Sequence, residues 1–448
     1  MKFRTGGKRL SFKPASPQGL IRCNSGADSK VWMGEGNYFK AFFRPLGVMC
    51  LAYLCPEDCF RALFVLKREI HFSQDGGQLR GENIYYMQMA LETAGKALGR
   101  TSPNPMVGAV VVRDGQVVGS GYHARAGTPH AEVHALREAG AKACGATLYV
   151  TLEPCCHHGR TGPCTEAVIK AGITKVVVAM EDPNPKVAGK GVKILQNAGI
   201  TVETGVLEEQ SRRLNEVFIK YISTRLPFVV MKTAMSLDGK IATASGESQW
   251  ITGPASRAMV HRLRDRYDAI LVGVGTVLAD NPSLTTRLSE GGGKDPVRVV
   301  LDSRARTPVD AQIITQSSHS PTIIVTTSDA PRVKLQQLSD AGAQIMQLSA
   351  DDNGICLHEL LCKLAEREIT SLLVEGGTRV NGTFINSNLV DKVCWFIAPK
   401  IIGGHAAPGP VGGIGITALA DAMKLSDISL QRYGEDIGIE GYVAKRGE

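Results

Sequence analysis

Long apolar runs, a dense set of cysteines and an export signal are all missing from this chain of 448 residues. The longest apolar stretch near the start, residues 47–55, is far short of the ~20 residues that a membrane helix needs. No basic segment followed by an apolar run opens the chain, so we expect no secretory signal. Eleven cysteines in 448 residues make no disulfide scaffold and favour free thiols or a metal site. We therefore expect a cytoplasmic protein without a membrane partner.

Most of the chain also lacks a large net charge. The net charge is +8, but residues 1–83 hold 13 Lys/Arg and 7 Asp/Glu, which leaves only +2 for the other 365 residues. A broad basic face for nucleic acid is therefore not expected. With 43% hydrophobic and 21% charged residues, wholesale disorder is excluded, and the length favours two or three domains.

Residues 1–83 differ from the rest of the chain. They contain four of the eleven cysteines and 11 of the 25 aromatic residues. No helical or strand period is sustained over residues 1–45, whereas residues 58–70 are compatible with a short helix. We interpret this segment as a disordered leader, with a functional tail or a partner-binding arm as the alternative.

Residues 84–226 alternate between helical and strand patterns, which predicts a layered α/β domain. Apolar residues recur at helical spacing between Met87 and Leu98, and a turn at residues 113–115 predicts a hairpin between the first two strands. The expected strands are residues 109–112, 117–119, 147–152, 175–179 and 201–203, and the expected helices are residues 132–143, 165–171 and 189–198.

Side chains that can bind a metal or transfer a proton lie at two strand–helix junctions of this domain. His130 and Glu132 start one expected helix, Cys155 follows a strand, and Cys164 starts the next helix. One histidine and two cysteines are ligands that Zn²⁺ prefers, with a fourth position left for water. Zinc lowers the pKa of that water, and Glu132 would carry the proton to a leaving amine. The pattern is typical of zinc nucleobase deaminases, although the gap between the two cysteines is longer here.

Two other kinds of zinc site fit parts of the same pattern. His130 and His134 are four residues apart, as in a metalloprotease helix, but the glutamate of that motif directly follows the first histidine. A structural site would take a fourth ligand, for which Cys156 and the two histidines after it are available. The deaminase hypothesis also accounts for Glu132, and we therefore prefer it.

Residues 227–448 carry a second α/β pattern after a boundary at residues 224–227. The expected strands are residues 228–232, 269–274, 297–302, 322–326, 371–375 and 393–398, and the expected helices are residues 255–267, 333–341 and 357–367. Gly376 and Gly377 stand between a strand and a helical pattern, where main-chain N–H groups can approach a phosphate. A tight strand-to-helix turn explains the same glycines equally well.

Longer motifs in both domains carry more information than spacing alone. They are residues 103–108, 121–123, 154–164 and 181–185 in the first domain, and residues 232–240, 246–252, 277–282, 300–303 and 397–400 in the second. Together they resemble the bifunctional deaminase–reductase family of riboflavin biosynthesis, in its domain order, over residues 84 to about 440. The resemblance implies a cytidine-deaminase-like three-layer domain (84–226) followed by a dihydrofolate-reductase-like domain (227–448).

The resemblance also implies cofactors and contact residues. It implies one zinc ion per chain, held by His130, Cys155 and Cys164, with Glu132 as the catalytic residue. The implied substrate contacts of the first domain are Asn104, His123, His157 and Arg160. The implied NADPH contacts of the second domain are Ala234, Trp250, Thr276, Asp280, Ser303, Gly377, Thr378, Arg379, Val380, Asn381, Gly382 and Thr383. The implied substrate contacts there are Lys232, Ser248, Arg264, Leu284, Arg287 and Glu375. Of these, Arg264 and Arg287 are suited to clamp a ribose phosphate bidentately.

The implied function is two consecutive steps on one small molecule. The first domain would remove an amino group from 2,5-diamino-6-(5-phosphoribosylamino)pyrimidin-4(3H)-one. The second would reduce the ribosyl side chain with NADPH, giving 5-amino-6-(5-phosphoribitylamino)uracil, and a homo-oligomer is usual for the family. A deaminase of another nucleotide or of tRNA is disfavoured by the reductase half. An inactive scaffold is disfavoured because all four zinc-site residues are present.

The leader allows a sharper hypothesis. Residues 2–8 and 24–36 can be back-translated, in that order, into strings that resemble conserved blocks of the flavin-mononucleotide riboswitch. On this hypothesis residues 1–83 are translated leader RNA, and the natural start lies near Met87 or Met89.

Overall fold

The computed structural model describes residues 2–5, 8–11, 29–34, 38–43, 48–53, 77–158, 162–352 and 354–444. Contacts divide the chain into two units, residues 1–81 and 82–448. In the first unit, β1 (Lys2–Thr5) and β2 (Lys8–Ser11) form an antiparallel pair, and β3 (Ser29–Gly34), β4 (Tyr38–Phe43) and β5 (Val48–Tyr53) form an antiparallel sheet.

These strands lie where the sequence predicts a disordered leader. Strand β4 reads YFKAFF, and such aromatic runs favour extended pairing. The expectation of no regular structure therefore does not hold for these five strands. The short helix expected at residues 58–70 lies outside the described residues.

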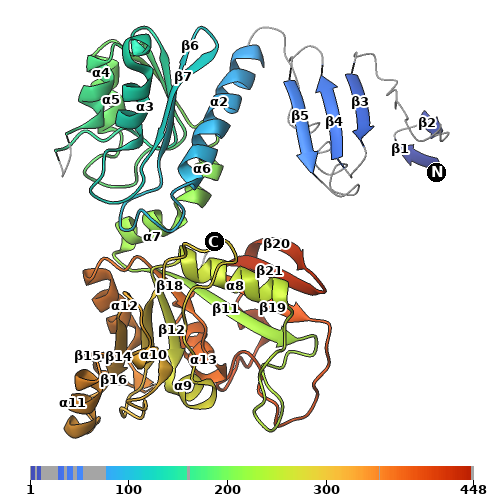
Figure 1. The fold of residues 1–448 in the computed structure, drawn as a ribbon, viewed down its shortest axis with the longest axis vertical. Helices are drawn as coiled ribbons and strands as arrows, with labels where there is room; N and C mark the ends of the chain where they lie inside the picture. The colour runs from blue at the N-terminus through green and yellow to red at the C-terminus, as the bar shows by residue number, and fades with distance from the viewer. Residues whose placement is uncertain are drawn as a thin grey trace. The chain divides into compact units, whose positions relative to one another are not determined.

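The first α/β domain is built on a five-stranded sheet (Figure 1). The strand order is β10-β9-β8-β6-β7, with β8, β9 and β10 parallel and β6 antiparallel to both of its neighbours. The strands are β6 (Gly108–Arg113), β7 (Gln116–Tyr122), β8 (Thr147–Val150), β9 (Lys175–Val178) and β10 (Thr201–Thr204). The helices are α2 (Gly77–Gly95), α3 (Ala131–Ala139), the 3₁₀ turn η1 (Gly140–Ala143), α4 (Cys164–Lys170), α5 (Lys190–Asn197), α6 (Glu208–Leu214) and α7 (Glu216–Thr224).

Alternating side chains of this sheet bury two faces under helices. Val111 and Leu148 pack with α3, α4 and α5, whereas Val110 and Tyr149 pack with α2 and α6. Gly108 lets α2 cross directly over β6, because a Cβ there would lie 2.0 Å from a main-chain oxygen of that helix. The result is the expected three-layer α/β/α arrangement.

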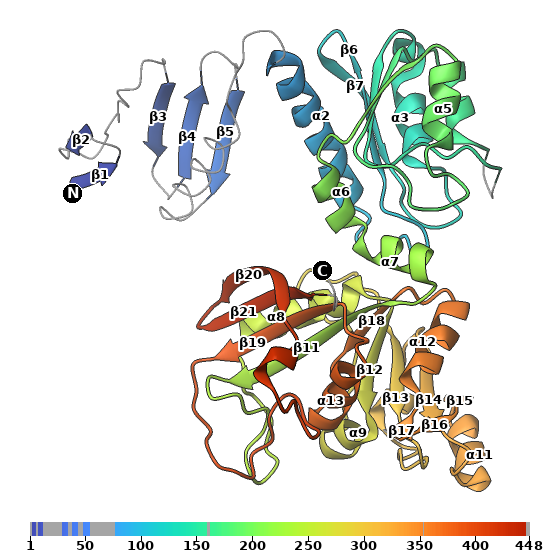
Figure 2. The same ribbon diagram turned by 180° about the vertical axis from the view of Figure 1, so that it is seen from behind.

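The second domain is built on a nine-stranded sheet (Figure 2). The order is β15-β14-β13-β12-β18-β11-β19-β21-β20, in which the first seven strands are parallel, β21 is antiparallel to β19, and β20 is antiparallel to β21. The strands are β11 (Phe228–Ser236), β12 (Ala269–Gly273), β13 (Val297–Leu301), β14 (Thr322–Thr326), β15 (Gln344–Gln347), β18 (Ser371–Val374), β19 (Lys392–Ala398), β20 (Leu425–Tyr433) and β21 (Asp436–Val443), with a small hairpin of β16 (Ala350–Asp351) and β17 (Gly354–Ile355). The helices are α8 (Pro254–Arg266), α9 (Val274–Asp280), α10 (Gln312–Thr315), α11 (Arg332–Asp340), α12 (Leu357–Glu366) and α13 (Thr378–Asn386), with a 3₁₀ turn η2 (Leu419–Asp421).

Helices cover both faces of this sheet as well. Leu271 and Val299 pack with α12 and α13, and Ile270 and Val300 pack with α9, α10 and α11 on the opposite face. Helix α8 lies on the same face as α9, over β11, β18 and β19. Because seven strands are parallel, their carboxyl ends share one edge, where ligands of such sheets bind. In the part of the chain that the structure describes, no helix is long and apolar enough to cross a membrane.

Candidate active sites

The three predicted zinc ligands come together at helix starts of the first domain. His130 is the N-cap residue of α3, Cys164 is the first residue of α4, and Cys155 lies in the loop after β8. The His130 Nδ1 atom lies 3.2 Å from the Cys164 Sγ atom and 3.5 Å from the Cys155 Sγ atom. All three donor atoms lie within 4.8 Å of one another. One nitrogen and two sulfurs at this spacing fit a zinc ion that keeps one open position.

Glu132 completes this centre from the first turn of α3. It is 3% exposed, and burial raises the pKa of its carboxyl to about 7. Hydrogen bonds from Cys164 and then His130 lower the pKa of the Cys155 thiol, so this group favours the thiolate that binds metal. A carboxyl with a pKa near neutrality can both accept and donate a proton.

A cavity of about 460 Å³ opens onto this centre. Asn104, His123 and His157, which the sequence predicts as substrate contacts, line it. The Asn104 Nδ2 atom lies 3.0 Å from the His123 Nε2 atom, and the His123 Nδ1 atom lies 3.3 Å from the Pro129 carbonyl oxygen. The carbonyl thereby orients the imidazole toward Asn104. Arg160 lies outside the described residues.

Sequence reasoning missed further residues of this cavity. Asp182, Asn184 and Lys186 follow β9 and line the wall, and burial raises the pKa of Asp182 to about 6. Glu153 fixes this loop, since its carboxylate accepts N–H groups of Asp182 at 3.1 Å and Gly189 at 2.9 Å. The motif at residues 181–185 lies at the carboxyl end of a strand, and that position was the available signal.

In the second domain, three charged side chains meet at the carboxyl edge of the sheet. The Glu375 carboxylate, directly after β18, accepts hydrogen bonds from Arg264 Nε at 2.8 Å, Arg264 Nη2 at 3.0 Å and Lys232 Nζ at 3.2 Å. The side chains are 9%, 13% and 14% exposed for Glu375, Arg264 and Lys232. Burial by itself raises the pKa of Glu375, but Arg264 and Lys232 together lower it to about 2.

Arg264 has little capacity left for a phosphate. Its Nη1 atom donates to the Thr285 carbonyl oxygen at 3.2 Å, in addition to the two bonds with Glu375. The Arg287 side chain is exposed, and among the described residues its guanidinium makes one hydrogen bond, to the Thr285 hydroxyl at 3.1 Å. Of the two arginines expected to clamp a phosphate, Arg287 is therefore the freer. The Ser248 hydroxyl donates to Asp280 at 3.3 Å, whereas Leu284 is 4% exposed and packs in the core beside Val277.

The glycine loop before α13 has the geometry of a phosphate site. A Cβ on Gly376 would lie 2.6 Å from the Val380 side chain, so close packing requires glycine there. Gly377 is the N-cap residue of the helix, and a Cβ there would meet nothing within 4 Å. An open N-terminus at the carboxyl edge suits a pyrophosphate, so the loop fits NADPH. Thr378 and Arg379 follow in the first turn of α13.

Other expected NADPH contacts have different surroundings. Asn381 is fully buried and donates to the Pro410 carbonyl oxygen at 2.9 Å, and its own side-chain oxygen has no hydrogen-bond partner among the residues that the structure describes. Trp250 is 62% exposed and stacks on the Arg257 guanidinium at 4.7 Å. Ser303 follows β13, and the Thr327 hydroxyl donates to its carbonyl oxygen at 3.0 Å. Ala234, Thr276 and Asp280 lie on β11 and α9, and Gly382 and Thr383 lie within α13.

Two family models match the chain. The cytidine and deoxycytidylate deaminase zinc-binding region matches residues 81–180, and the RibD C-terminal domain matches residues 227–439. Riboflavin biosynthesis protein RibD of Actinobacillus pleuropneumoniae is 47% identical over 355 residues, which are 79% of this chain and 94% of that protein. The Escherichia coli RibD is 42% identical over 367 residues, 80% of this chain and 98% of that protein.

Solved structures agree with these matches. A structure of Acinetobacter baumannii RibD has a TM-score of 0.74 and 40% identity, covering 82% of this chain and all of the other. A Thermotoga maritima diaminohydroxyphosphoribosylaminopyrimidine deaminase/5-amino-6-(5-phosphoribosylamino)uracil reductase has a TM-score of 0.72 and 38% identity, with the same 82% coverage.

The fold and its two sites define a zinc-dependent deaminase joined to a reductase with a dihydrofolate-reductase-like fold. Such a protein combines a hydrolase and an oxidoreductase in one chain. This chain belongs to the RibD family of bifunctional riboflavin biosynthesis enzymes, and its cofactors are zinc and NADPH.

Proposed function

We propose that the first domain hydrolyses the 2-amino group of 2,5-diamino-6-(5-phosphoribosylamino)pyrimidin-4(3H)-one. The observation that supports this most directly is the buried Glu132 beside the three zinc ligands, at the floor of a cavity large enough for a pyrimidine ribotide. Zinc bound there lowers the pKa of a coordinated water toward neutrality. Glu132 takes the water proton and delivers it to the departing amine, and Asn104 and His123 hold the substrate.

We propose that His157 and Arg160 complete the substrate contacts of this domain. His157 is exposed and lines the cavity, which suits contact with the ribose phosphate end. Asp182 and Asn184 also line the cavity and would bind the ring.

We propose that the second domain reduces the ribosyl side chain of the deaminated product to ribityl. NADPH supplies the hydride in this step. The segment from Gly377 to Thr383, which the sequence predicts as a loop but which forms the N-cap and first turns of α13, would hold the cofactor with Ala234, Trp250, Thr276, Asp280 and Ser303. Substrate contacts would come from Lys232, Ser248, Arg264, Leu284, Arg287 and Glu375. The paired charges of Lys232, Arg264 and Glu375 fix a polar floor against which the sugar can be oriented.

The test uses the full chain and one substitution in the deaminase site. Glu132→Gln keeps the zinc ligands but cannot move a proton, so ammonia release should fall by roughly 10²–10⁴-fold while zinc content is unchanged. NADPH oxidation should persist when 5-amino-6-(5-phosphoribosylamino)uracil is supplied. If wild-type protein with bound zinc neither releases ammonia nor oxidises NADPH with these compounds, the proposed substrates are wrong.

We also propose a homo-oligomeric cytoplasmic enzyme that binds no nucleic acid. The edge strand β20 supports self-association, because Ile428 and Leu430 are 58% and 70% exposed on it. Light scattering of the purified chain would show a monomer mass if this is wrong. Residues 1–83 are proposed to contain a leader that ends before α2, because α2 begins at Gly77 and Asn83 already bonds Glu203 and Tyr149 within the deaminase domain. The intact mass of natively expressed protein distinguishes a start near Met87 or Met89 from the full chain.

A further inference from the structure

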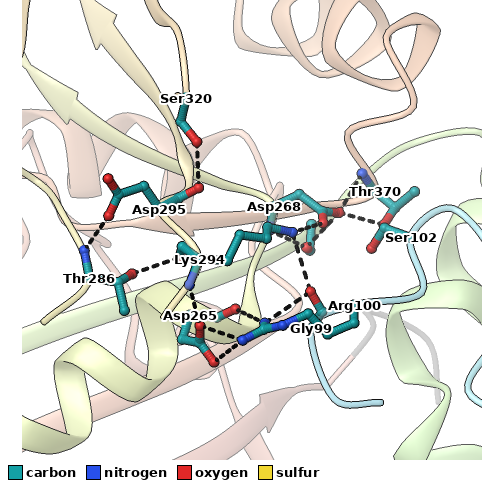
Figure 3. A network of polar contacts seen from close by, with 11 residues as sticks. Gly99, Arg100, Ser102, Asp265, Asp268, Thr286, Lys294, Asp295, Ser320 and Thr370 are labelled. Carbon is teal, nitrogen blue, oxygen red and sulfur yellow. Dashed lines mark hydrogen bonds and ion pairs between the residues drawn. The ribbon is translucent and has the colours of Figure 1, made fainter. Parts of the chain in front are cut away.

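The segment after α2 reaches both catalytic domains. Pro103, Asn104 and Pro105 line the deaminase cavity. Only a few residues earlier, Gly99 and Arg100 contact the C-terminal turn of α8 in the reductase domain (Figure 3). The same short segment therefore belongs to one site and touches the element that builds the other.

Arg100 holds both the side chain and the main chain of Asp265 on α8. Its Nη2 atom lies 2.8 and 3.0 Å from the two carboxylate oxygens, and its Nη1 atom donates to the Asp265 carbonyl oxygen at 3.1 Å. That carbonyl is one of the last in the helix and has no partner within it. Gly99 packs against the same turn, since a Cβ there would lie 2.7 Å from the Asp265 carbonyl oxygen.

Asp265 also hydrogen-bonds to the segment that carries Arg287. Its Oδ1 atom accepts the Lys294 N–H at 2.7 Å, and Lys294 Nζ donates to the Gly99 carbonyl oxygen at 3.3 Å (Figure 3). The Thr286 hydroxyl donates to the Lys294 carbonyl oxygen at 2.8 Å. Lys294 and Thr286 therefore connect the loop between α9 and β13 to Gly99 and Asp265. Thr286 directly precedes Arg287 in this loop.

The neighbour of Asp265 on α8 faces the reductase site. Arg264 bonds Glu375, and its Nη1 atom holds the Thr285 carbonyl oxygen at 3.2 Å. Arg264 and Arg287 therefore both depend on where the last turn of α8 lies. Arg100 contacts that turn from the other domain.

We propose that Arg100, a residue of the deaminase domain, is a positioning residue for the reductase substrate. It fixes the last turn of α8 and, through Asp265 and Lys294, the loop that presents Arg287. This rests on the proposed function, in which Arg287 contacts the substrate, and on the expectation from the sequence that this arginine binds the phosphate. Misplacing a charged ligand of a phosphate weakens ground-state binding more than hydride transfer.

The experiment compares variants of the full chain with 5-amino-6-(5-phosphoribosylamino)uracil and NADPH. Arg100→Gln should raise KM for this substrate roughly tenfold, the equivalent of one charge-assisted hydrogen bond, with kcat and KM for NADPH unchanged. Arg100→Lys keeps a cation beside the carboxylate and should restore part of the affinity. Ribose 5-phosphate, tested as a competitive inhibitor, should lose affinity in parallel.

Two reference variants separate the possible failures. Arg113→Gln removes another half-exposed arginine of the same domain, paired with Asp114 at 3.6 Å, and should behave as wild type. Arg287→Gln tests the proposed substrate site itself. If Arg287→Gln raises the substrate KM and Arg100→Gln does not, the positioning role is refuted. It is also refuted if Arg100→Gln weakens NADPH and substrate equally and lowers the thermal midpoint, because that is general destabilisation. If Arg287→Gln has no effect, the proposed substrate site is what fails.

Discussion

Replacing Glu375 with glutamine should destabilise the reductase domain strongly and in a pH-dependent way. The change keeps the shape of the side chain but removes the negative charge that lies between Lys232 and Arg264. Both cations are almost buried, at 14% and 13% side-chain exposure, so neither can regain full hydration. Removing one member of a buried ion pair typically costs about 3–5 kcal/mol, because a charge is left without compensation.

The pKa of Glu375 provides a second estimate. A carboxyl whose pKa is lowered from 4.5 to about 2 on folding contributes about 3 kcal/mol at neutral pH, in agreement with the first value. Because the folded pKa lies below the unfolded one, this stabilisation is fully present above about pH 4.5. It is lost as the pH falls through about 2. The difference between wild type and Glu375→Gln should therefore be constant from pH 5 to 8 and shrink below pH 4.5.

Urea unfolding followed by tryptophan fluorescence measures this difference. Trp250 and Trp395 lie in the reductase domain, the third tryptophan, Trp32, lies in residues 1–83, and residues 84–226 contain none, so the signal contains no contribution from the deaminase domain. A loss of about 3 kcal/mol should lower the urea midpoint by roughly 1 M or more. Glu366→Gln, which breaks an exposed pair with Lys363, serves as the control and should cost at most about 1 kcal/mol. Equal midpoints for Glu375→Gln and wild type at pH 7 would refute the reasoning.

Three further changes test the metal ligands, one close contact and the cofactor loop. Cys164→Ser should abolish zinc binding while Cys156→Ser retains it, measured by metal analysis of the purified proteins; equal zinc in both would contradict the ligand set. Gly108→Ala should lower the thermal midpoint sharply because its Cβ has no room against α2, whereas Gly95→Ala, with nothing within 4 Å, should not. Gly377→Ala should change the thermal midpoint little, since a Cβ there meets nothing within 4 Å, but should weaken NADPH binding at least tenfold, measured by cofactor fluorescence. An unchanged affinity would place the pyrophosphate elsewhere.

The zinc centre was the most predictable part of the molecule. His130 and Glu132 are neighbours on one helix, and the two cysteines flank a single loop, so local spacing alone brings most of the site together. The positions of most strands and helices in both domains were also predictable from local sequence. A buried apolar run such as Val110–Val112 predicts a strand without reference to where that strand lies in the sheet. The sequence carries less information about Asp182, whose role depends on the fold of the following loop.

The charged cluster of the reductase domain could not be derived from spacing. Lys232, Arg264 and Glu375 come from β11, α8 and the end of β18, and they meet because β11 pairs in parallel with β18, with Met231 opposite Val374. Nothing in the local pattern specifies that strand order. Family resemblance identified the three residues, but it did not indicate that Glu375 occupies most of the Arg264 guanidinium.

The antiparallel strands β20 and β21 were not predicted from the sequence, and the physical reason is a different one. The interior residues of β20 are exposed on both faces, and its pairing with β21 shifts register between Ser426 and Ser429, so no clean alternation marks it. An edge strand of this kind leaves one row of backbone groups open to pairing. A sequence rule that looks for buried alternation is blind to such a strand. The exposure of β20 therefore explains why the sequence did not predict this strand, and it is also the observation on which the proposal of self-association rests.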